Sequence, residues 1–354
     1  MSEVIKINIT KTSLSRINEQ SLKDIPFGHC FTDHMLVADY ADGKWQKVEI
    51  MPYQALHFDP SLAALHYGQS IFEGIKAFKE ASGDISVFRP IENFNRFNHS
   101  AKRMQMPEVP ESIFMDGMKT LINLDRAWVP EIEDHALYIR PFMFATDTYL
   151  GVRPSLTYKF IIILSPTGPY FSAPMRIYVE EKFTRAVAGG VGFAKNAGNY
   201  AASLHPAVKA KELGYDQVLW TDATEHKYLQ EVGMMNVFFV INNQAITPSL
   251  EEGTILPGIT RKSALQLLKD MGIEAVERRI SIDELIEAYK AGQLTEVFGT
   301  GTAATISMIK ALGYKDYLME FDTEKATIAP ALKIRLTSIQ KGIDADTHGW
   351  LFKV

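Results

Sequence analysis

Short apolar runs separated by polar turns dominate the first half of the chain. Four such runs fall into two predicted hairpins, residues 31–40 with 44–50 and residues 74–78 with 85–88. The first pair flanks Ala41-Asp42-Gly43 and the second flanks Ser82-Gly83-Asp84. Turns rich in Asp and Gly between apolar runs are typical of β-hairpins. We therefore expect antiparallel strands in this half.

A helical pattern follows from Pro90. Apolar side chains recur there at spacings of three and four residues, at Phe94, Phe97, Ala101 and Met104. This spacing places the four side chains on one face of a helix, and proline is favoured in a first helical turn. Arg96 lies off this apolar face and is available for another contact.

Helical and strand-sized segments alternate in the second half. Two strands are predicted from apolar runs, at residues 217–220 and 237–241. Two helices are predicted, each followed by a glycine, at residues 201–213 and 259–271. Pro206 is compatible with a later start of the first helix, and Ser281-Ile282-Asp283-Glu284 is a capping box for a third. The chain is predicted to be mixed α and β.

A stretch rich in proline and glycine, Ser165 to Pro174, separates the apolar run 158–164 from the apolar run 175–179. This composition is typical of a linker, and 354 residues are enough for about two domains. We expect an N-terminal domain at residues 1–164, a linker at 165–175 and a C-terminal domain at 176–354.

Composition excludes several classes of protein. The net charge is −5 and no basic block occurs, so nucleic acid is not an expected partner. Apolar runs such as 160–164 are too short to span a bilayer, and the first residues lack the pattern of a secretion signal. Cys30 is the only cysteine, which excludes an internal disulfide and argues against a cysteine zinc site. We expect a cytoplasmic enzyme without a metal.

Lys195 lies in an unusual setting, between Gly189 and Tyr200 in a segment of glycines and small residues. An amine without solvated neighbours can lose its proton and attack a carbonyl. Glu231 follows in the similarly apolar segment Gln230 to Asn236. Together they indicate pyridoxal phosphate (PLP), whose aldehyde a lysine carries as an imine and whose ring nitrogen an acid holds. Taken singly, Lys195 is more often a surface lysine, and Glu231 a helix cap or an arginine partner.

Bound PLP also needs a donor to its ring hydroxyl and a cradle for its phosphate. Tyr200 is the candidate donor, unless it is a core tyrosine. The phosphate candidates are one arginine and the groups of two turns, namely Arg96, the N–H groups of Ile259 and Thr260, and Thr302. Taken singly, Arg96 is more often a solvated helix arginine. Helix starts such as that at Ile259 and Thr260 are common, and a plain hairpin explains the turn at Thr302 about as well.

Eight stretches match the motifs of one family, in family order: Phe27-Gly28 with Phe31 to Met35, Leu65 to Gly74, Arg89-Pro90 with Asn93 and Arg96, Leu137 to Pro141, Gly189 to Tyr200, Glu231 to Asn236, Leu256 to Arg261, and Phe298 to Ala303. Through them the chain resembles the branched-chain amino acid aminotransferases of the fold-type IV group of PLP enzymes. The resemblance implies a mixed α/β enzyme with a smaller N-terminal domain, a larger C-terminal PLP-binding domain and the cofactor between them.

The resemblance also implies a role for each motif residue. Lys195 binds the cofactor and moves a proton between the substrate Cα and the cofactor C4′. Glu231 keeps the pyridine nitrogen protonated, and Tyr200 bonds to the ring oxygen. The phosphate is held by Arg96, Ile259, Thr260 and Thr302. The N–H groups of the Thr302-Ala303 turn face the substrate carboxylate.

The implied substrate pocket has an aromatic and aliphatic wall, suited to a branched side chain: Phe27, Tyr67, Phe72, Tyr138, Tyr170 and Ala303. Leu150 and Val152 match a loop that the second subunit contributes, and Tyr67 is also a candidate for that origin. Arg140 is the candidate partner for the distal carboxylate of glutamate. Met234 departs from the small residue or threonine of some relatives.

We interpret the sequence as a homodimeric, cytoplasmic enzyme that moves an amino group between leucine, isoleucine or valine and 2-oxoglutarate. D-amino acid transaminases and aminodeoxychorismate lyases are the nearest alternatives within the fold, and Tyr138-Ile139-Arg140 favours the branched-chain enzyme. A PLP-binding regulator without turnover is an alternative of another class. The set of Lys195, Glu231 and Tyr200 argues against it.

Overall fold

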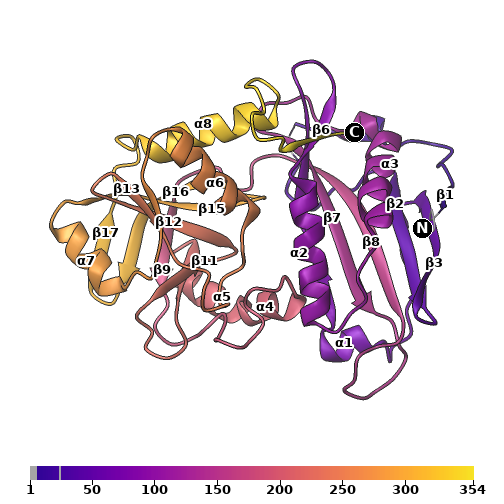
Figure 1. The fold of residues 1–354 in the computed structure, drawn as a ribbon, viewed down its shortest axis with the longest axis horizontal. Coiled ribbons are helices and arrows are strands. Elements are labelled where there is room, and N and C mark those ends of the chain that lie inside the picture. The colour runs from indigo at the N-terminus through magenta and orange to yellow at the C-terminus, as the bar shows by residue number, and fades with distance from the viewer. Residues whose placement is uncertain (1–5, 24) are drawn as a thin grey trace. The chain divides into compact units, whose positions relative to one another are not determined.

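The computed structural model describes residues 6–23 and 25–354. The chain divides into two compact units. The first unit contains residues 1–170, 194–197 and 339–354, and the second contains residues 171–193 and 198–338. In Figure 1 the first unit is mostly indigo to magenta and the second mostly pink to yellow.

The first unit is built on one mostly antiparallel sheet with the strand order β1-β3-β2-β8-β7-β5-β6-β18, and with β4 paired to β7. Its strands are β1 (Ile7–Ile9), β2 (His34–Ala41), β3 (Lys44–Pro52), β4 (Ser70–Phe72), β5 (Ile75–Lys79), β6 (Ile85–Phe88), β7 (Ala136–Ala145), β8 (Tyr158–Thr167) and β18 (Leu351–Lys353). Its α-helices are α1 (Ala63–Tyr67), α2 (Pro90–Arg103) and α3 (Gly117–Leu124).

Local sequence signals explain much of this unit. Asp42 and Gly43 both have positive φ, at 53° and 72°, and form the predicted turn between β2 and β3. Helix α2 begins at Pro90 as predicted and buries Phe97 fully. The ring of Phe97 packs against Phe160 of β8 at a centroid distance of 5.5 Å. The apolar face of α2 therefore covers one face of the sheet (Figure 1).

The second unit contains a sheet with the order β11-β10-β9-β16-β15-β12-β13-β14, and β11 also pairs with β12. That additional pairing closes six of the strands into a ring. The strands are β9 (Met175–Val179), β10 (Gln217–Thr221), β11 (Leu229–Val232), β12 (Met235–Ile241), β13 (Gln244–Thr247), β14 (Ala275–Glu277), β15 (Leu294–Gly301), β16 (Thr305–Tyr314) and β17 (Tyr317–Glu320). The helices that lie wholly in this unit are α5 (Leu204–Glu212), α6 (Ile259–Asp270) and α7 (Ile282–Lys290).

Two predicted helix starts in this unit are confirmed. Helix α6 begins at Ile259, directly after Gly258. Helix α7 begins after Ser281, whose hydroxyl accepts a hydrogen bond from the N–H of Glu284 at 3.1 Å. This bond satisfies a donor that a first helical turn leaves without an intrahelical acceptor.

The helix predicted at residues 201–213 is confirmed with the later start that Pro206 allowed, and the structure has two helices in this region rather than one. They are α4 (Ala197–Ala202) and α5, with Ser203 between them. The Ser203 hydroxyl donates to the carbonyl of Tyr200 at 2.7 Å. Pro206 has no N–H to donate, so it is tolerated in the first turn of α5 but not in the interior of one long helix.

The two units differ from the domains expected from the sequence. Strand β8 continues to Thr167, so the first residues of the expected linker belong to the sheet. Residues 339–354 lie with the first unit because β18 pairs with β6, with Leu351 opposite Phe88. The first unit consequently contains more residues than the second, although the resemblance implied a smaller N-terminal domain. Within the described residues, no helix is both long and apolar enough to cross a membrane.

Candidate functional site

The main chain at Lys195 is fixed on both sides by elements of the first unit. Its N–H donates to the hydroxyl of Ser100 on α2 at 2.9 Å, and its carbonyl accepts from the N–H of Phe72 on β4 at 3.0 Å. The next residue, Asn196, forms a bridge to Ile71. The Lys195 Nζ lies 4.8 Å from the ring centroid of Phe72. The structure thus brings together two residues that the sequence assigned to the site.

Arg96 is not a solvated helix arginine, because it forms an ion pair with Glu73. Its Nε donates to Oε1 at 2.7 Å and a terminal nitrogen donates to Oε2 at 2.8 Å. The Glu73 side chain is fully buried, and its Oε2 also accepts from Asn93 at 2.8 Å. Burial alone raises the pKa of Glu73, but the charge and hydrogen bonds of Arg96, the charge of Lys195 and the Asn93 bond outweigh it and lower the pKa.

An aromatic cluster forms from three predicted pocket residues of the first unit. Phe27 meets the ring of Tyr138 at 4.8 Å and the ring of Tyr170 at 5.0 Å, both edge to face. Gly74 lies against Tyr138, since a Cβ added at Gly74 would come within 2.2 Å of the tyrosine oxygen. Glycine at that position therefore lets Tyr138 keep its place in the cluster.

Arg140 lies at the edge of this cluster. A terminal nitrogen donates to the Tyr138 hydroxyl at 3.0 Å, and its Nε donates to the main-chain carbonyl of Glu73 at 3.0 Å. The guanidinium lies 4.8 Å from the ring centroid of Phe72. A cation is thus held in a fixed orientation beside aromatic rings, where it is suited to meet a carboxylate.

Three predicted pocket residues of the first unit lie at the surface. Tyr67 is in α1, with its ring centroid 6.1 Å from that of His66. Leu150 and Val152 are 65% and 89% exposed, in the loop between β7 and β8. These side chains do not wall the aromatic cluster of their own unit.

In the second unit, Glu231 on β11 is a buried carboxylate with fixed partners. Arg185 lies 3.1 Å from its Oε1, and the N–H of Leu256 donates to the same oxygen at 2.5 Å. Arg185 also donates to the main-chain carbonyls of Gly192 and Thr254, at 3.0 and 2.7 Å. The arginine therefore joins Glu231 to the segment before Lys195 and to the loop before α6.

The start of α6 has the features of an anion site. Its cap residue, Gly258, has no side chain to bond the free N–H groups of the first turn, which contains the buried Ile259 and Thr260. Asn236 lies against this turn, because a Cβ at Gly258 would come within 1.9 Å of the Asn236 Oδ1. The Asn236 amide also donates to the carbonyl of Leu256 at 2.9 Å. Helix N-termini of this kind bind phosphate and carboxylate groups.

Strand register connects these parts within the second unit. Asn236 of β12 pairs with Glu231 of β11 on one side and with Thr300 of β15 on the other. The Thr300 hydroxyl is buried and has no hydrogen-bond partner among the described residues. Thr302 and Ala303 follow in the turn between β15 and β16. These two strands form a hairpin, which was one of the two interpretations of this turn from the sequence.

Tyr200, the remaining predicted cofactor residue, lies on α4 and is partly buried. Sequence reasoning assigned no role to Glu73, Arg185 or Asn236. Glu73 stood within a matched motif, and a carboxylate inside the apolar run from Ile71 to Phe78 was a signal for a buried ion pair. Among the described residues, no group of three or more His, Cys, Asp or Glu side chains is placed to hold a metal ion.

Comparisons with known proteins show which family this chain resembles. The family model of amino-transferase class IV matches residues 70–312. A probable branched-chain-amino-acid aminotransferase of Staphylococcus aureus (strain MRSA252) is 50% identical over 356 residues, covering 99% of this chain and 98% of that protein. The crystal structure of the Escherichia coli branched-chain amino acid aminotransferase has a TM-score of 0.75 and 26% identity, covering 90% of this chain and 98% of that one.

A third relative was solved in complex with N-(5'-phosphopyridoxyl)-L-glutamate. This T.th. branched-chain amino acid aminotransferase has a TM-score of 0.72 and 26% identity, covering 89% of this chain and 97% of that one. The family model spans more than half of the sequence, and the Staphylococcus aureus relative matches it almost from end to end. The chain belongs to the class IV amino-transferase family.

Proposed function

We propose that this protein is a PLP-dependent aminotransferase that exchanges amino groups between leucine, isoleucine or valine and 2-oxoglutarate. The observation that carries the proposal is Arg140, a cation bonded to Tyr138 at the edge of the aromatic cluster. Such a site offers rings to an aliphatic side chain and a charge to a distal carboxylate. The names of the relatives and the phosphopyridoxyl-glutamate complex of the T.th. enzyme support the same reaction.

The residues present fit the proposed cofactor. Glu231 is a buried anion stabilised by Arg185, as a partner for a protonated ring nitrogen must be. The uncapped first turn of α6 offers N–H groups to a phosphate dianion, and Arg96 offers a charge. When bound, PLP supplies an electron sink that eases removal of the substrate Cα proton.

Each residue has one task in the proposed mechanism. Lys195 would hold the cofactor through its aldehyde, and its Nζ would carry a proton between the substrate Cα and the cofactor. Glu231 would keep a proton at the ring nitrogen, and Tyr200 would donate to the ring oxygen. The N–H groups at Thr302 and Ala303 orient the substrate carboxylate. Arg140 holds the second carboxylate of glutamate or 2-oxoglutarate.

The test compares the two half-reactions in Arg140→Ala. Without the cation, a distal carboxylate lies in an apolar pocket unpaired, which typically costs several kcal/mol. The glutamate half-reaction should therefore lose far more kcat/KM than the leucine half-reaction. Wild-type activity on a panel of L- and D-amino acids and Lys195→Ala as an inactive control complete the experiment. An equal loss on both substrates, or a preference for D-amino acids, contradicts the proposal.

We also propose a homodimer in which the active sites are shared. Leu150 and Val152 support it, because both side chains are exposed although the resemblance places them in a substrate pocket. Sedimentation over a concentration series tests it, and a monomer at micromolar concentration contradicts it. The cytoplasmic location, inferred from the single cysteine, stays a prediction.

A further inference from the structure

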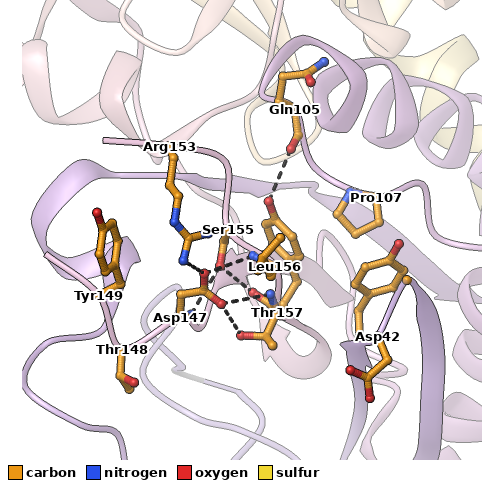
Figure 2. A pocket seen from close by; sticks show the side chains of 13 residues that line it. Asp42, Gln105, Pro107, Asp147, Thr148, Tyr149, Arg153, Ser155, Leu156 and Thr157 are labelled. Carbon is orange, nitrogen blue, oxygen red and sulfur yellow. Dashed lines mark hydrogen bonds and ion pairs between the residues drawn. The ribbon is translucent and has the colours of Figure 1, made fainter. Parts of the chain in front are cut away.

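The loop at residues 146–157, between β7 and β8, is tied together at its base by one carboxylate (Figure 2). Asp147 accepts hydrogen bonds from the N–H groups of Leu156 and Thr157, both at 3.1 Å. It also accepts from the Thr157 hydroxyl at 2.9 Å. A single side chain from the start of the loop thus satisfies two main-chain donors at its end.

Further bonds hold the same base. The Asp147 N–H donates to the hydroxyl of Ser155 at 3.2 Å, and its carbonyl accepts from the N–H of Ala63 at 2.8 Å. The hydroxyl of Thr146 donates to that of Thr157 at 2.8 Å. The two ends of the loop are therefore closed against each other and against the start of α1.

The tip of the loop is folded onto this base. Arg153 pairs with Asp147 at 2.9 Å, and its guanidinium lies 4.6 Å from the ring centroid of Tyr149. Tyr149 in turn covers Gly151, where a Cβ would come within 2.2 Å of the ring. Figure 2 shows Arg153 between Asp147 and Tyr149.

The loop exposes several large apolar side chains, beside the exposed Thr148 and Arg153. Leu150 and Val152 are exposed, and so are Tyr149 and Leu156. Apolar groups clustered at the tip of an otherwise well-bonded loop are typical of a contact surface. Ordering a free loop on contact costs conformational entropy, and internal bonds that order it beforehand remove that cost.

We propose that Asp147 is a positioning residue that holds the 146–157 loop in the shape that delivers Leu150 and Val152 to the substrate pocket of a second copy of this chain. The inference rests on the proposed function, and it adds the residue on which the shared pocket wall depends. A second copy is the occupant because Leu150 and Val152 are 65% and 89% exposed in their own chain, although the resemblance places them in a substrate pocket. Asp147 acts on the substrate only through the loop.

Asp147 holds the loop in its ionised form. Burial alone raises the pKa of Asp147, but the hydrogen bonds from Leu156, Thr157 and Ser155 and the charge of Arg153 outweigh it and lower the pKa. At neutral pH Asp147 therefore stays an acceptor for all its donors. Asparagine has one acceptor oxygen and no charge, so Asp147→Asn should reproduce part of the defect of Asp147→Ala.

The first test measures KM and kcat separately in a variant that lacks the Asp147 carboxylate. In Asp147→Ala we expect the KM for leucine to rise about tenfold, while kcat changes by less than about threefold and PLP affinity is unchanged (about 1.4 kcal/mol per tenfold). The matched control is Asp222→Ala, because Asp222 accepts four main-chain N–H groups in a turn of the second unit. It should lower thermal stability with KM unchanged. A raised KM in both variants, or in neither, overturns the proposal.

A double-mutant cycle tests the route of the effect. If Asp147 acts through the tip, its removal should raise KM less than about twofold once Leu150 and Val152 are both alanine, because the groups it positions are gone. A full tenfold increase in that background would show a route independent of the tip and overturn the proposal.

Mixed dimers test whether the loop acts on the other copy. Coexpression of the Asp147→Ala chain with a Lys195→Ala chain, purified through two different tags, creates one site that combines Lys195 with an intact loop from the partner. We expect wild-type KM at that site. The KM of the Asp147→Ala homodimer would mean that the loop serves its own chain.

Failure of the proposed function is recognised separately. It appears as a wild-type protein that does not convert leucine and 2-oxoglutarate. The association constant from sedimentation still tests the loop in that case. Asp147→Ala should weaken self-association at least tenfold and Asp222→Ala should not, and equal association of all three proteins overturns the role of Asp147.

Discussion

Each of the two units contains a buried pair of arginine and glutamate, and the pairs are arranged in opposite ways. In the first unit, Glu73 has both carboxylate oxygens bonded to Arg96, and the arginine is the member assigned to the cofactor. In the second unit, the carboxylate of Glu231 is the member assigned to the cofactor, and Arg185 supports it. In the proposed function, one pair would offer a cation to a phosphate and the other an anion to a ring nitrogen.

The supporting members also differ in their other contacts. Arg185 has two main-chain carbonyls as acceptors besides Glu231. Glu73 has its carboxylate oxygens bonded by the side chains of Arg96 and Asn93. Removal of Glu73 takes away the acceptor of two charge-assisted bonds from Arg96 and of one bond from Asn93. Removal of Glu231 leaves Arg185 with its two carbonyl acceptors, so we expect the second pair to tolerate loss of its glutamate better than the first.

Glu73→Ala is expected to cause the largest loss of stability. It leaves the buried Arg96 without its carboxylate, and breaking a buried pair in this way typically costs about 3–5 kcal/mol. Glu231→Ala should cost clearly less, because Arg185 keeps its carbonyl acceptors. Urea unfolding of the cofactor-free proteins measures both. Equal losses would remove the distinction between the pairs.

Glu231→Gln should cause the largest loss of activity in a folded protein. The amide cannot keep the ring nitrogen charged, and losing one such electrostatic contact typically lowers kcat on the order of 100-fold. Glu73→Gln should instead raise the PLP dissociation constant by a larger factor than it lowers the kcat measured at saturating PLP. A Glu231→Gln enzyme within a factor of two of wild type would assign Glu231 to structure alone.

Alanine substitutions at two glycines should distinguish an effect on PLP binding from an effect on substrate binding. Gly258→Ala forces Asn236 away from the start of α6, and Gly74→Ala forces Tyr138 out of the aromatic cluster. Overpacking of this kind typically costs about 1–3 kcal/mol. The first variant should raise the PLP dissociation constant and the second the KM for leucine. The opposite assignment of effects would contradict the site as described.

The smallest effect expected is a change at acidic pH in the difference in unfolding free energy between wild type and Glu73→Gln. The folded pKa of Glu73 lies below its ordinary value of 4.5, so its ionisation stabilises the fold above that pH. This contribution is lost as the pH falls through the folded pKa. The stability gap between the two proteins should therefore narrow below pH 4.5 and stay constant above it. Unfolding curves at several pH values measure the gap, and a constant gap at all pH values contradicts the pairing.

The sequence predicted those features that depend on neighbouring residues. Pro90 and Ser281 marked helix starts correctly because caps act over three or four positions. The family motifs assigned roles to Arg96 and Glu231 but none to their partners, although Glu73 lies within a matched motif. Glu73 and Arg185 are far from them in the chain, and tertiary packing brings each pair together. The break at Ser203 was missed because a serine next to a helical pattern is an ambiguous signal.

The pairing of β18 with β6 has a consequence for the order in which the protein is made. The other strands of the first unit are complete once Thr167 has been synthesised, but the free edge of β6 is covered only by residues 351–353. Translation at about 5–20 residues per second leaves roughly 10–40 seconds between these events. During that interval the nascent first unit has an open sheet edge, which is a template for pairing with another chain. The second unit has no such dependence, since all of its strands lie within residues 171–338.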